Sequence, residues 1–163
     1  MARKPVIAII GSGSEIEPSV TNARELGRLV AESGWVLISG GRDAGVMRAA
    51  NEGAKEVDQS VTIGILPNRG AQVASAVDVA IVTDMGQARN NIIVLSADVV
   101  IACGVDGAGT VSEVSLAIKN GKQVVLLDAN ETAGAFFDGI GRDQVRHASS
   151  PGQAIEMIKR IVN

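Results

Sequence analysis

The stretch from Gly104 to Glu113 carries residue types that suit the binding of a phosphate group. It reads GVDGAGTVSE and lies between an apolar run and a pattern typical of a helix. A helix that begins at such a turn offers free backbone N–H groups and its positive dipole end to an anion, which small residues allow to approach closely. The candidate ligand-binding residues here are Gly107, Ala108, Gly109 and Thr110. A tight strand-to-helix connection without a ligand would use the same residues, and Thr110 stands where a Walker A loop requires lysine.

Two other glycine turns also follow apolar runs. The first, GSG at residues 11–13, lacks the third glycine of the dinucleotide-binding fingerprint because Ile16 stands at that position. The second, SGGRDAGVM at residues 39–47, would let a ligand lie against the backbone. The candidate binding residues in these turns are Gly11, Ser12, Gly40 and Gly41. Turn formation alone would explain each glycine, but several such turns on one rim favour a shared ligand cleft.

Arg89 and Glu113 are the charged candidates. Arg89 stands near the start of a very apolar helical segment, and a guanidinium suits bidentate recognition of phosphate. A surface arginine at the rim is the alternative interpretation. Glu113 falls one turn into the helix after the phosphate turn, where a carboxylate commonly complements the helix dipole. In a closed site beside a sugar, it could instead stabilise a developing cation or orient water.

Strand and helix patterns alternate along the whole chain and must position these residues. Apolar runs predict strands at Val6–Ile10, Trp35–Ser39, Val61–Leu66, Val79–Thr83, Asp98–Cys103, Gln123–Leu127 and, as a seventh, Gln144–Ala148. Helical spacing predicts helices at Ser19–Glu32, Ala44–Val57, Asp84 to about Ser96, Thr110–Asn120 and from Ser150 onward. Capping boxes are expected at Asp84 and Ser150.

This alternation predicts an α/β fold. We expect a single Rossmann-like domain over residues 1–163, with a doubly wound parallel sheet of six to seven strands flanked by helices. In such a sheet, ligands bind beyond the carboxyl ends of the strands, at the point where the strand order reverses. The three glycine turns follow strands and would therefore lie along that one rim.

Composition excludes several functions. The chain has 163 residues, 46% of them hydrophobic, so it can bury a sizeable core. A net charge of −3 and only 2% aromatic residues argue against partners such as nucleic acid or an anionic membrane surface. One cysteine and one histidine leave no Cys- or His-rich metal site, and we expect no metal. No apolar run is long enough to span a membrane, so we expect a cytoplasmic protein.

Three segments together resemble the superfamily once described as lysine decarboxylase-like. They are residues 39–47, 88–96 and 107–113. The superfamily includes the LONELY GUY cytokinin-activating phosphoribohydrolases and the molybdenum cofactor carrier proteins. In the hydrolases, a Pro-Gly-Gly-x-Gly-Thr-x-x-Glu motif carries the nucleotide phosphate, and Gly107 to Glu113 match that motif from its second glycine onward.

The sequence departs from the hydrolase pattern, and its segment Asn90–Ile93 resembles the carrier branch. Val105 and Asp106 replace the first two motif residues, and Asn90 replaces the lysine that follows the arginine on the middle helix. We expect Asp106 to bring a negative charge beside the phosphate turn. The resemblance implies a binding protein for a phosphorylated small molecule, either a nucleotide or a molybdenum cofactor-like molecule.

The resemblance also implies two alternatives and an assembly. A nucleoside 5′-monophosphate phosphoribohydrolase would use Arg89 to grip the nucleotide and Glu113 to support the ribose as catalytic residues. A DNA-binding member of the superfamily is the third possibility, and the acidic charge counts against it. The resemblance implies a homo-dimer or tetramer. The apolar run Ile92–Leu95 further predicts that its helix packs against a second subunit about a two-fold axis.

Overall fold

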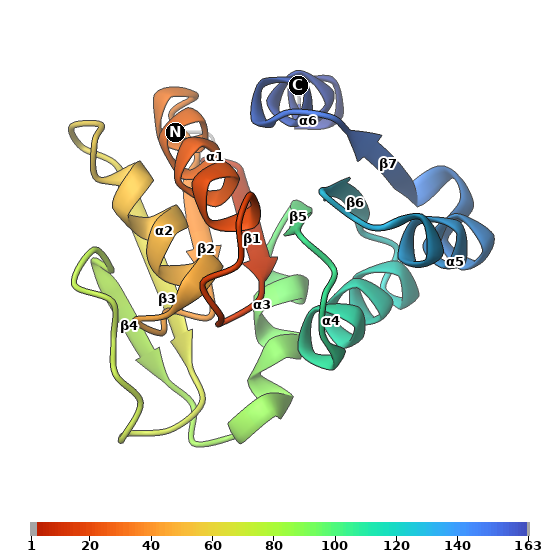
Figure 1. Ribbon diagram of the computed structural model, residues 1–163. Helices are drawn as coiled ribbons and strands as arrows, with labels where there is room; N and C mark the ends of the chain where they lie inside the picture. The colour runs from red at the N-terminus through yellow and green to blue at the C-terminus, as the bar shows by residue number, and fades with distance from the viewer. Residues whose placement is uncertain (1–2, 163) are drawn as a thin grey trace.

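The computed structural model describes residues 3–162 and contains one parallel sheet (Figure 1). Its strands are β1 (Val6–Gly11), β2 (Val36–Ser39), β3 (Val61–Leu66), β4 (Val79–Val82), β5 (Val99–Cys103), β6 (Gln123–Leu127) and β7 (Val145–Ala148). They lie in the order β4-β3-β2-β1-β5-β6-β7, and every neighbouring pair is parallel. The predicted doubly wound α/β fold is therefore confirmed, including the seventh strand.

Helices cover both faces of the sheet. The first face packs against α1 (Ser19–Glu32), α2 (Gly45–Ala54) and α6 (Pro151–Val162). The second packs against α3 (Asn90–Ser96), α4 (Ala108–Lys119) and α5 (Glu131–Gly141). Short 3-10 turns, η1 (Gly86–Arg89) and η2 (Arg142–Gln144), precede α3 and β7. Because the central strands are buried on both faces, their sequences are continuously apolar rather than alternating.

The strand order reverses between β1 and β5. From β1 the chain moves outward to β4, then returns to place β5 on the other side of β1. The connections after these two strands diverge to opposite faces of the sheet, and this leaves a crevice at their carboxyl ends. The turns that begin at Gly11 and Gly104 therefore meet at one place although they are distant in sequence.

Several element boundaries differ from the predictions. β2 begins at Val36 rather than Trp35, and α2 is shorter at both ends than Ala44–Val57. The capping box expected at Asp84 is wrong. Asp84 has a φ of +53°, and its carboxylate accepts a hydrogen bond from the backbone N–H of Arg69 at 3.2 Å, so it holds a loop instead of a helix end. Half of the box expected at Ser150 is present. Ser150 Oγ accepts from the Gln153 backbone N–H at 3.2 Å, but the Gln153 side chain accepts from the Ser149 N–H at 2.6 Å and not from that of Ser150.

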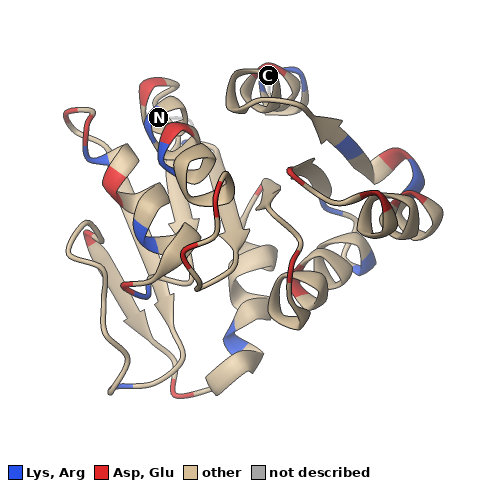
Figure 2. Cartoon of the chain, in the orientation of Figure 1, with Lys and Arg blue, Asp and Glu red and all other residues tan. Residues whose placement is uncertain are grey.

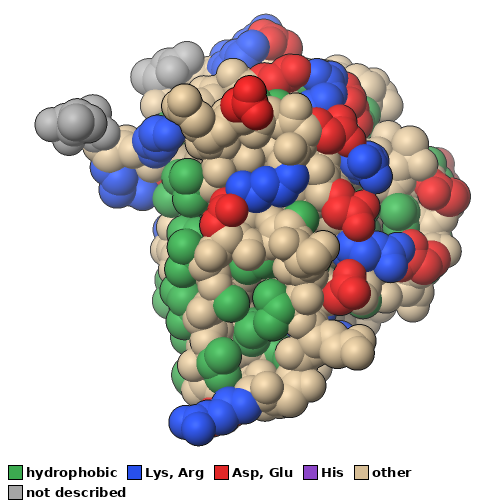
Figure 3. Space-filling view, turned by 90° about the vertical axis from the view of Figure 1, so that its left-hand side faces the viewer, with side chains coloured by type: hydrophobic (Ala, Val, Ile, Leu, Met, Phe, Trp, Pro, Cys, Tyr) green, Lys and Arg blue, Asp and Glu red, His purple; other side chains and the backbone are tan. Residues whose placement is uncertain are grey.

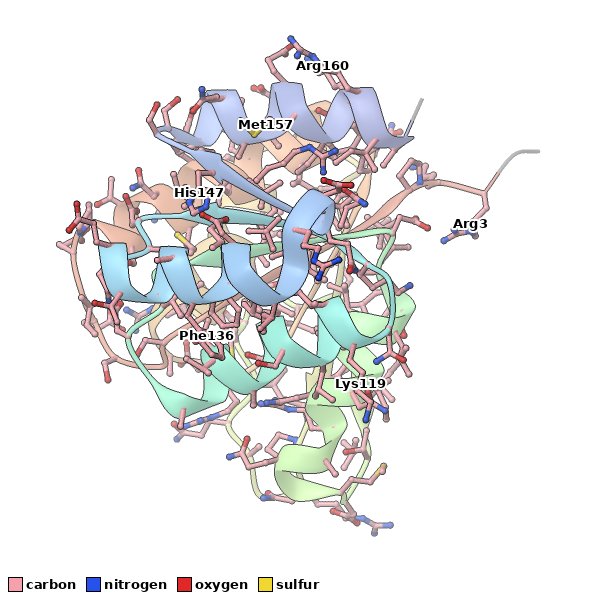
Figure 4. All side chains as sticks on the ribbon, turned by 90° about the vertical axis from the view of Figure 1, so that its right-hand side faces the viewer. Arg3, Lys119, Phe136, His147, Met157 and Arg160 are labelled. Atoms are coloured by element: carbon pink, nitrogen blue, oxygen red, sulfur yellow. The ribbon has the colours of Figure 1, made fainter. Side chains whose placement is uncertain are left out.

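The helix α5 was not predicted. Its start is capped by Asn130, whose side-chain oxygen accepts a hydrogen bond from the Ala133 backbone N–H at 2.9 Å. Phe137 points into the core while Phe136 is 54% exposed on the outer side, where Figure 4 labels it. The only histidine, His147 on β7, reaches back to this helix and pairs with Asp138 through Nε2 and Oδ1 at 2.7 Å. This pair holds the end of the sheet against α5.

Charged residues of both signs lie mainly on helices and loops, and the central strands carry almost none (Figure 2). No helix within residues 3–162 is long and apolar enough to cross a membrane. The apolar run in α3 is largely internal, because Ile93 and Val94 are fully buried and only Leu95 is strongly exposed. The helix alone thus gives little support to the predicted two-fold contact, which stays a prediction.

Candidate functional site

The crevice at the switch point encloses a cavity of about 200 Å³. It gathers eight of the residues that the sequence singled out: Gly11, Ser12, Gly40, Arg89, Gly107, Gly109, Thr110 and Glu113. They come from four segments, namely the ends of β1 and β2, the turn η1 and the start of α4. A parallel sheet brings these segments together because the carboxyl ends of its strands share one edge.

Gly41 and Ala108 do not line the cavity. Gly41 has a φ of +66°, and a Cβ there would lie 2.6 Å from the Cα of Gly64. This glycine is needed for the close packing of the turn against β3. Ala108 is the first residue of α4 and its side chain is exposed. Only its backbone N–H belongs to the helix end that faces the crevice.

The start of α4 offers unpaired backbone donors. Gly107 is the N-cap residue in an extended conformation, and no side chain caps the helix. The first N–H groups of a helix have no partner within the helix. The twelve residues of α4 also direct the positive end of the helix dipole to this point. The helix begins two residues earlier than predicted, so Gly109 lies in its first turn.

Arg89 is buried against the backbone of Gly40. Its side chain is only 4% exposed. A Cβ on Gly40 would lie 3.1 Å from Arg89 Nη2 and 2.6 Å from Met47 Sδ, so the guanidinium approaches this closely because residue 40 is glycine. Burial lowers the pKa of Arg89, the nearby Glu113 carboxylate raises it, and the Arg42 charge lowers it further. The site therefore holds a poorly solvated cation.

Glu113 lies in the same cavity with only 7% of its surface exposed. Burial raises the pKa of its carboxyl group to about 7, although the charge of Arg89 acts in the opposite direction. No hydrogen bond contributes to this shift. At neutral pH the glutamate is thus divided between its neutral and charged forms. With Arg89 and Arg42 beside it, the cavity carries a net positive charge.

Two buried polar atoms at the cavity have no hydrogen-bond partner among the described residues. They are Arg89 Nε and Asn90 Oδ1, one a donor and the other an acceptor. Asn90 is 4% exposed. Leaving such an atom unpaired costs about 1–3 kcal/mol, so native structures nearly always satisfy them. A ligand with an anionic group and a hydrogen-bond donor would satisfy both atoms.

Sequence analysis missed several lining residues. Gly13, Arg42, Met47, Gln87 and Asn90 belong to the cavity but were not among the candidates. Each stands within two residues of a named candidate or on the same predicted turn, so position alone could have suggested them. Asp106, in contrast, does not line the cavity, and its Oδ2 lies over Gly104 instead. The repulsion expected from this carboxylate therefore acts from outside the site.

A larger groove of about 480 Å³ lies between α1 and α6, near Trp35 at the opposite end of β2. None of the unpaired buried polar atoms found within residues 3–162 lines it. In the same part of the chain, no three His, Cys, Asp or Glu side chains are grouped to hold a metal ion. The switch-point cavity is therefore the better candidate for a ligand site.

The fold and this crevice define a Rossmann-type α/β protein with a polar cavity at the sheet's switch point. More specifically, the chain belongs to the SLOG cluster4 family, whose family model matches residues 4–155. An uncharacterised protein of Archaeoglobus fulgidus is 44% identical over 121 residues, which cover 74% of this chain and 78% of that protein.

Solved structures with this fold include molybdenum cofactor proteins. The molybdenum cofactor binding protein of Rippkaea orientalis is 49% identical, with a TM-score of 0.94 and full coverage of both chains. The molybdenum cofactor carrier protein of Chlamydomonas reinhardtii is 42% identical, with a TM-score of 0.91 over 98% of this chain and 99% of that one. DNA processing protein A of Helicobacter pylori shares the fold at 22% identity, with a TM-score of 0.72 over 96% and 80% of the two chains.

Proposed function

We propose that this protein binds a phosphorylated, cofactor-like small molecule, such as the molybdenum cofactor, in the switch-point cavity. The observation that carries the proposal is the pair of buried atoms without partners, Arg89 Nε and Asn90 Oδ1, beside the uncapped start of α4. The first-turn N–H groups of α4, the Thr110 hydroxyl and Arg89 would hold the phosphate, and Asn90 would accept a hydrogen bond from the rest of the ligand. The similarity to molybdenum cofactor binding and carrier proteins supports this ligand class.

Calorimetric titration with inorganic phosphate tests the proposal. Gly109→Leu places a bulky side chain at the first turn of α4, and a Cβ there meets nothing within 4 Å, so the fold should survive. Gly139→Leu, at an equally open glycine in α5, is the matched control. We expect saturable binding by the wild type and the control, and at least tenfold weaker binding by Gly109→Leu. Equal affinities in all three proteins would place the site elsewhere.

Hydrolysis of nucleoside monophosphates is a second candidate, favoured by the buried Glu113 near Arg89. In that reaction water would add to C1′ of the ribose, the glycosidic bond to the base would break, and the base would leave with a proton. Only ionised Glu113 could stabilise the developing cation. Because Asn90 stands where the hydrolase pattern has lysine, we propose that binding, not hydrolysis, is the function. Incubation with AMP should release little or no ribose 5-phosphate.

We further propose that two copies of the chain assemble through the edge strand β4. All four of its residues are exposed although they are apolar, with Val79, Ile81 and Val82 at 44–47%. Viewed from the β4 side, the molecule shows hydrophobic side chains gathered along its left flank and lower centre (Figure 3). Leu95 of α3 adds to the exposed apolar surface.

The strand register and the lengths of the neighbouring helices explain why this surface is exposed to solvent. Val79 and Ile81 pair with Ile63 and Ile65 of β3, so all four point to the face that α3 covers. The seven residues of α3 are too few to reach the edge, and no helix connects β3 to β4. An exposed apolar edge strand with unpaired backbone groups is a template for pairing with another chain. A second copy fits because one unpaired edge strand can pair with its own two-fold mate.

Light scattering on the purified protein tests this assembly. Ile81→Lys should reduce the mass to the monomer value of 16.7 kDa, while the wild type shows at least twice that mass. Phe136→Lys changes an apolar residue on α5 that is even more exposed, at 54% against 44% for Ile81, and should leave the assembly intact. A monomeric wild type, or an Ile81→Lys protein of unchanged mass, would contradict the proposal.

A further inference from the structure

Two fully buried polar side chains lie just behind the wall of the switch-point cavity. Ser39 is the last residue of β2, Asn51 belongs to the second half of α2, and neither is exposed to solvent. The described residues that line the cavity do not include them. Burying a polar group costs free energy unless it forms hydrogen bonds, so the partners of these two side chains show what they do.

The two side chains form one hydrogen-bonded unit with the turn after β2. Asn51 Nδ2 donates to Ser39 Oγ at 2.9 Å and to the Met47 carbonyl oxygen at 2.7 Å. Ser39 Oγ also accepts from the Gly41 backbone N–H at 3.1 Å. The unit therefore ties the end of β2, the turn at residues 40–41 and the start of α2 to one another.

This 40–41 turn is the surface against which Arg89 packs. A Cβ on Gly40 would lie 2.6 Å from Met47 Sδ and 3.1 Å from Arg89 Nη2, so the backbone of the turn is in close contact with both side chains. Arg89 Nε has no hydrogen-bond partner among the described residues, so packing against the turn helps to place the guanidinium. A shift of Gly40 would thus move Arg89 within the cavity.

The stability of α2 alone does not account for Asn51. Its Oδ1 is buried without a hydrogen-bond partner in residues 3–162, and leaving such an atom unpaired costs free energy. Alanine has a higher helix propensity than asparagine, and the preceding residues of α2, Ala49 and Ala50, are alanines. Asparagine therefore makes the helix less stable, and what it adds are the two hydrogen bonds that Nδ2 donates.

We propose that Ser39 and Asn51 are positioning residues for anion binding. They hold the 40–41 turn in the place that presents Arg89 to the anion. Asn51 acts through Ser39, and Ser39 acts through the Gly41 N–H. This inference rests on the proposed function, since the anion at the start of α4 is what Arg89 would grip. It goes further by assigning a role in affinity to two side chains that touch no ligand.

Calorimetric titration with inorganic phosphate tests the inference. Ser39→Ala and Asn51→Ala should each bind phosphate at least fivefold more weakly than the wild type, with circular dichroism showing a retained fold. The double variant should bind no more weakly than Ser39→Ala alone, because Asn51 acts through the Ser39 hydroxyl. Each single variant tests the inference alone if the other fails to fold.

Thr62→Val is the matched control. It removes another fully buried hydroxyl that accepts a hydrogen bond from a backbone N–H, that of Asp78 at 2.9 Å, and Thr62 does not line the cavity. This variant should lose stability in urea but bind phosphate as the wild type does. The ¹⁵N signal of the Arg89 Nε–H in the ligand-free proteins should shift in Ser39→Ala and Asn51→Ala and stay in place in Thr62→Val.

The outcomes separate this inference from the proposed function. If the wild type and both alanine variants bound phosphate equally well, the inference would be overturned and the proposed function would stand. If Thr62→Val weakened binding as much as Ser39→Ala, affinity would follow overall stability, and the inference would again be wrong. A double variant that lost the product of the two single losses would overturn the action of Asn51 through Ser39. A wild type that did not bind phosphate would overturn both the inference and the proposed function.

Discussion

The buried carboxyl group of Glu113 should make the stability of the ligand-free protein depend on pH. Its pKa rises from an ordinary 4.5 to about 7 in the folded state, so between these values the folded protein binds more protons than the unfolded chain. The contribution of Glu113 to the free energy of unfolding is then fully present below pH 4.5 and is lost as the pH rises toward 7. The size of this loss is about 3 kcal/mol, from a shift of roughly two and a half units at 1.36 kcal/mol each.

Glu113→Gln removes the titration while keeping the shape of the side chain. We expect urea unfolding curves of this variant and the wild type to differ little at pH 4.5. At pH 8 the variant should be about 3 kcal/mol more stable, seen as a higher denaturation midpoint at an unchanged slope. Glu131→Gln, at an exposed glutamate that begins α5, reports the effect of losing a surface charge. If the free energies of unfolding of the wild type and of Glu113→Gln changed with pH in the same way, the carboxyl group would not be desolvated in the folded protein, and this prediction would be wrong.

Three further predictions concern the same site and the helix that the sequence did not reveal. Sulfate keeps the same charge between pH 6 and pH 8. It should bind more weakly at pH 8, because ionised Glu113 then competes with it for Arg89. Calorimetry on Glu113→Gln should show the same affinity at both pH values. Gly40→Ala should weaken sulfate binding at least tenfold by displacing Arg89, with circular dichroism showing a retained fold; an unchanged affinity would mean that Arg89 does not grip the anion. Asn130→Ala should lower the free energy of unfolding by about 1 kcal/mol, the usual value of an N-cap, as measured in urea.

The sheet was predictable because the sequences of its central strands are continuous apolar runs. Val6–Ile10 and Val99–Cys103 are buried on both faces, so their periodicity could not be mistaken for a surface element. The glycine turns could be placed on one rim because a parallel sheet aligns its carboxyl ends. Arg89 and Glu113 were found through their residue types and the resemblance to known motifs, and the structure brings both into one cavity.

The remaining features depend on contacts between distant segments. The role of Gly41 follows from its approach to Gly64 on the neighbouring strand, which no local pattern encodes. Asp84 resembles an N-cap in sequence, but its carboxylate holds the Arg69 backbone. The apolar run in α3 gave no indication of which of its residues would be exposed. The structure instead exposes the apolar residues of the edge strand β4. The raised pKa of Glu113 likewise arises from the packing around it and not from its position in the helix.

The most direct test of the account is a titration with inorganic phosphate followed by ¹⁵N nuclear magnetic resonance. Phosphate bound at the switch point should cause saturable shifts of the backbone N–H signals of Ala108, Gly109 and Thr110, together with the Nε–H signal of Arg89, all with one dissociation constant. Unchanged signals at the start of α4, or shifts confined to the groove between α1 and α6, would contradict the placement of the phosphate at the switch point.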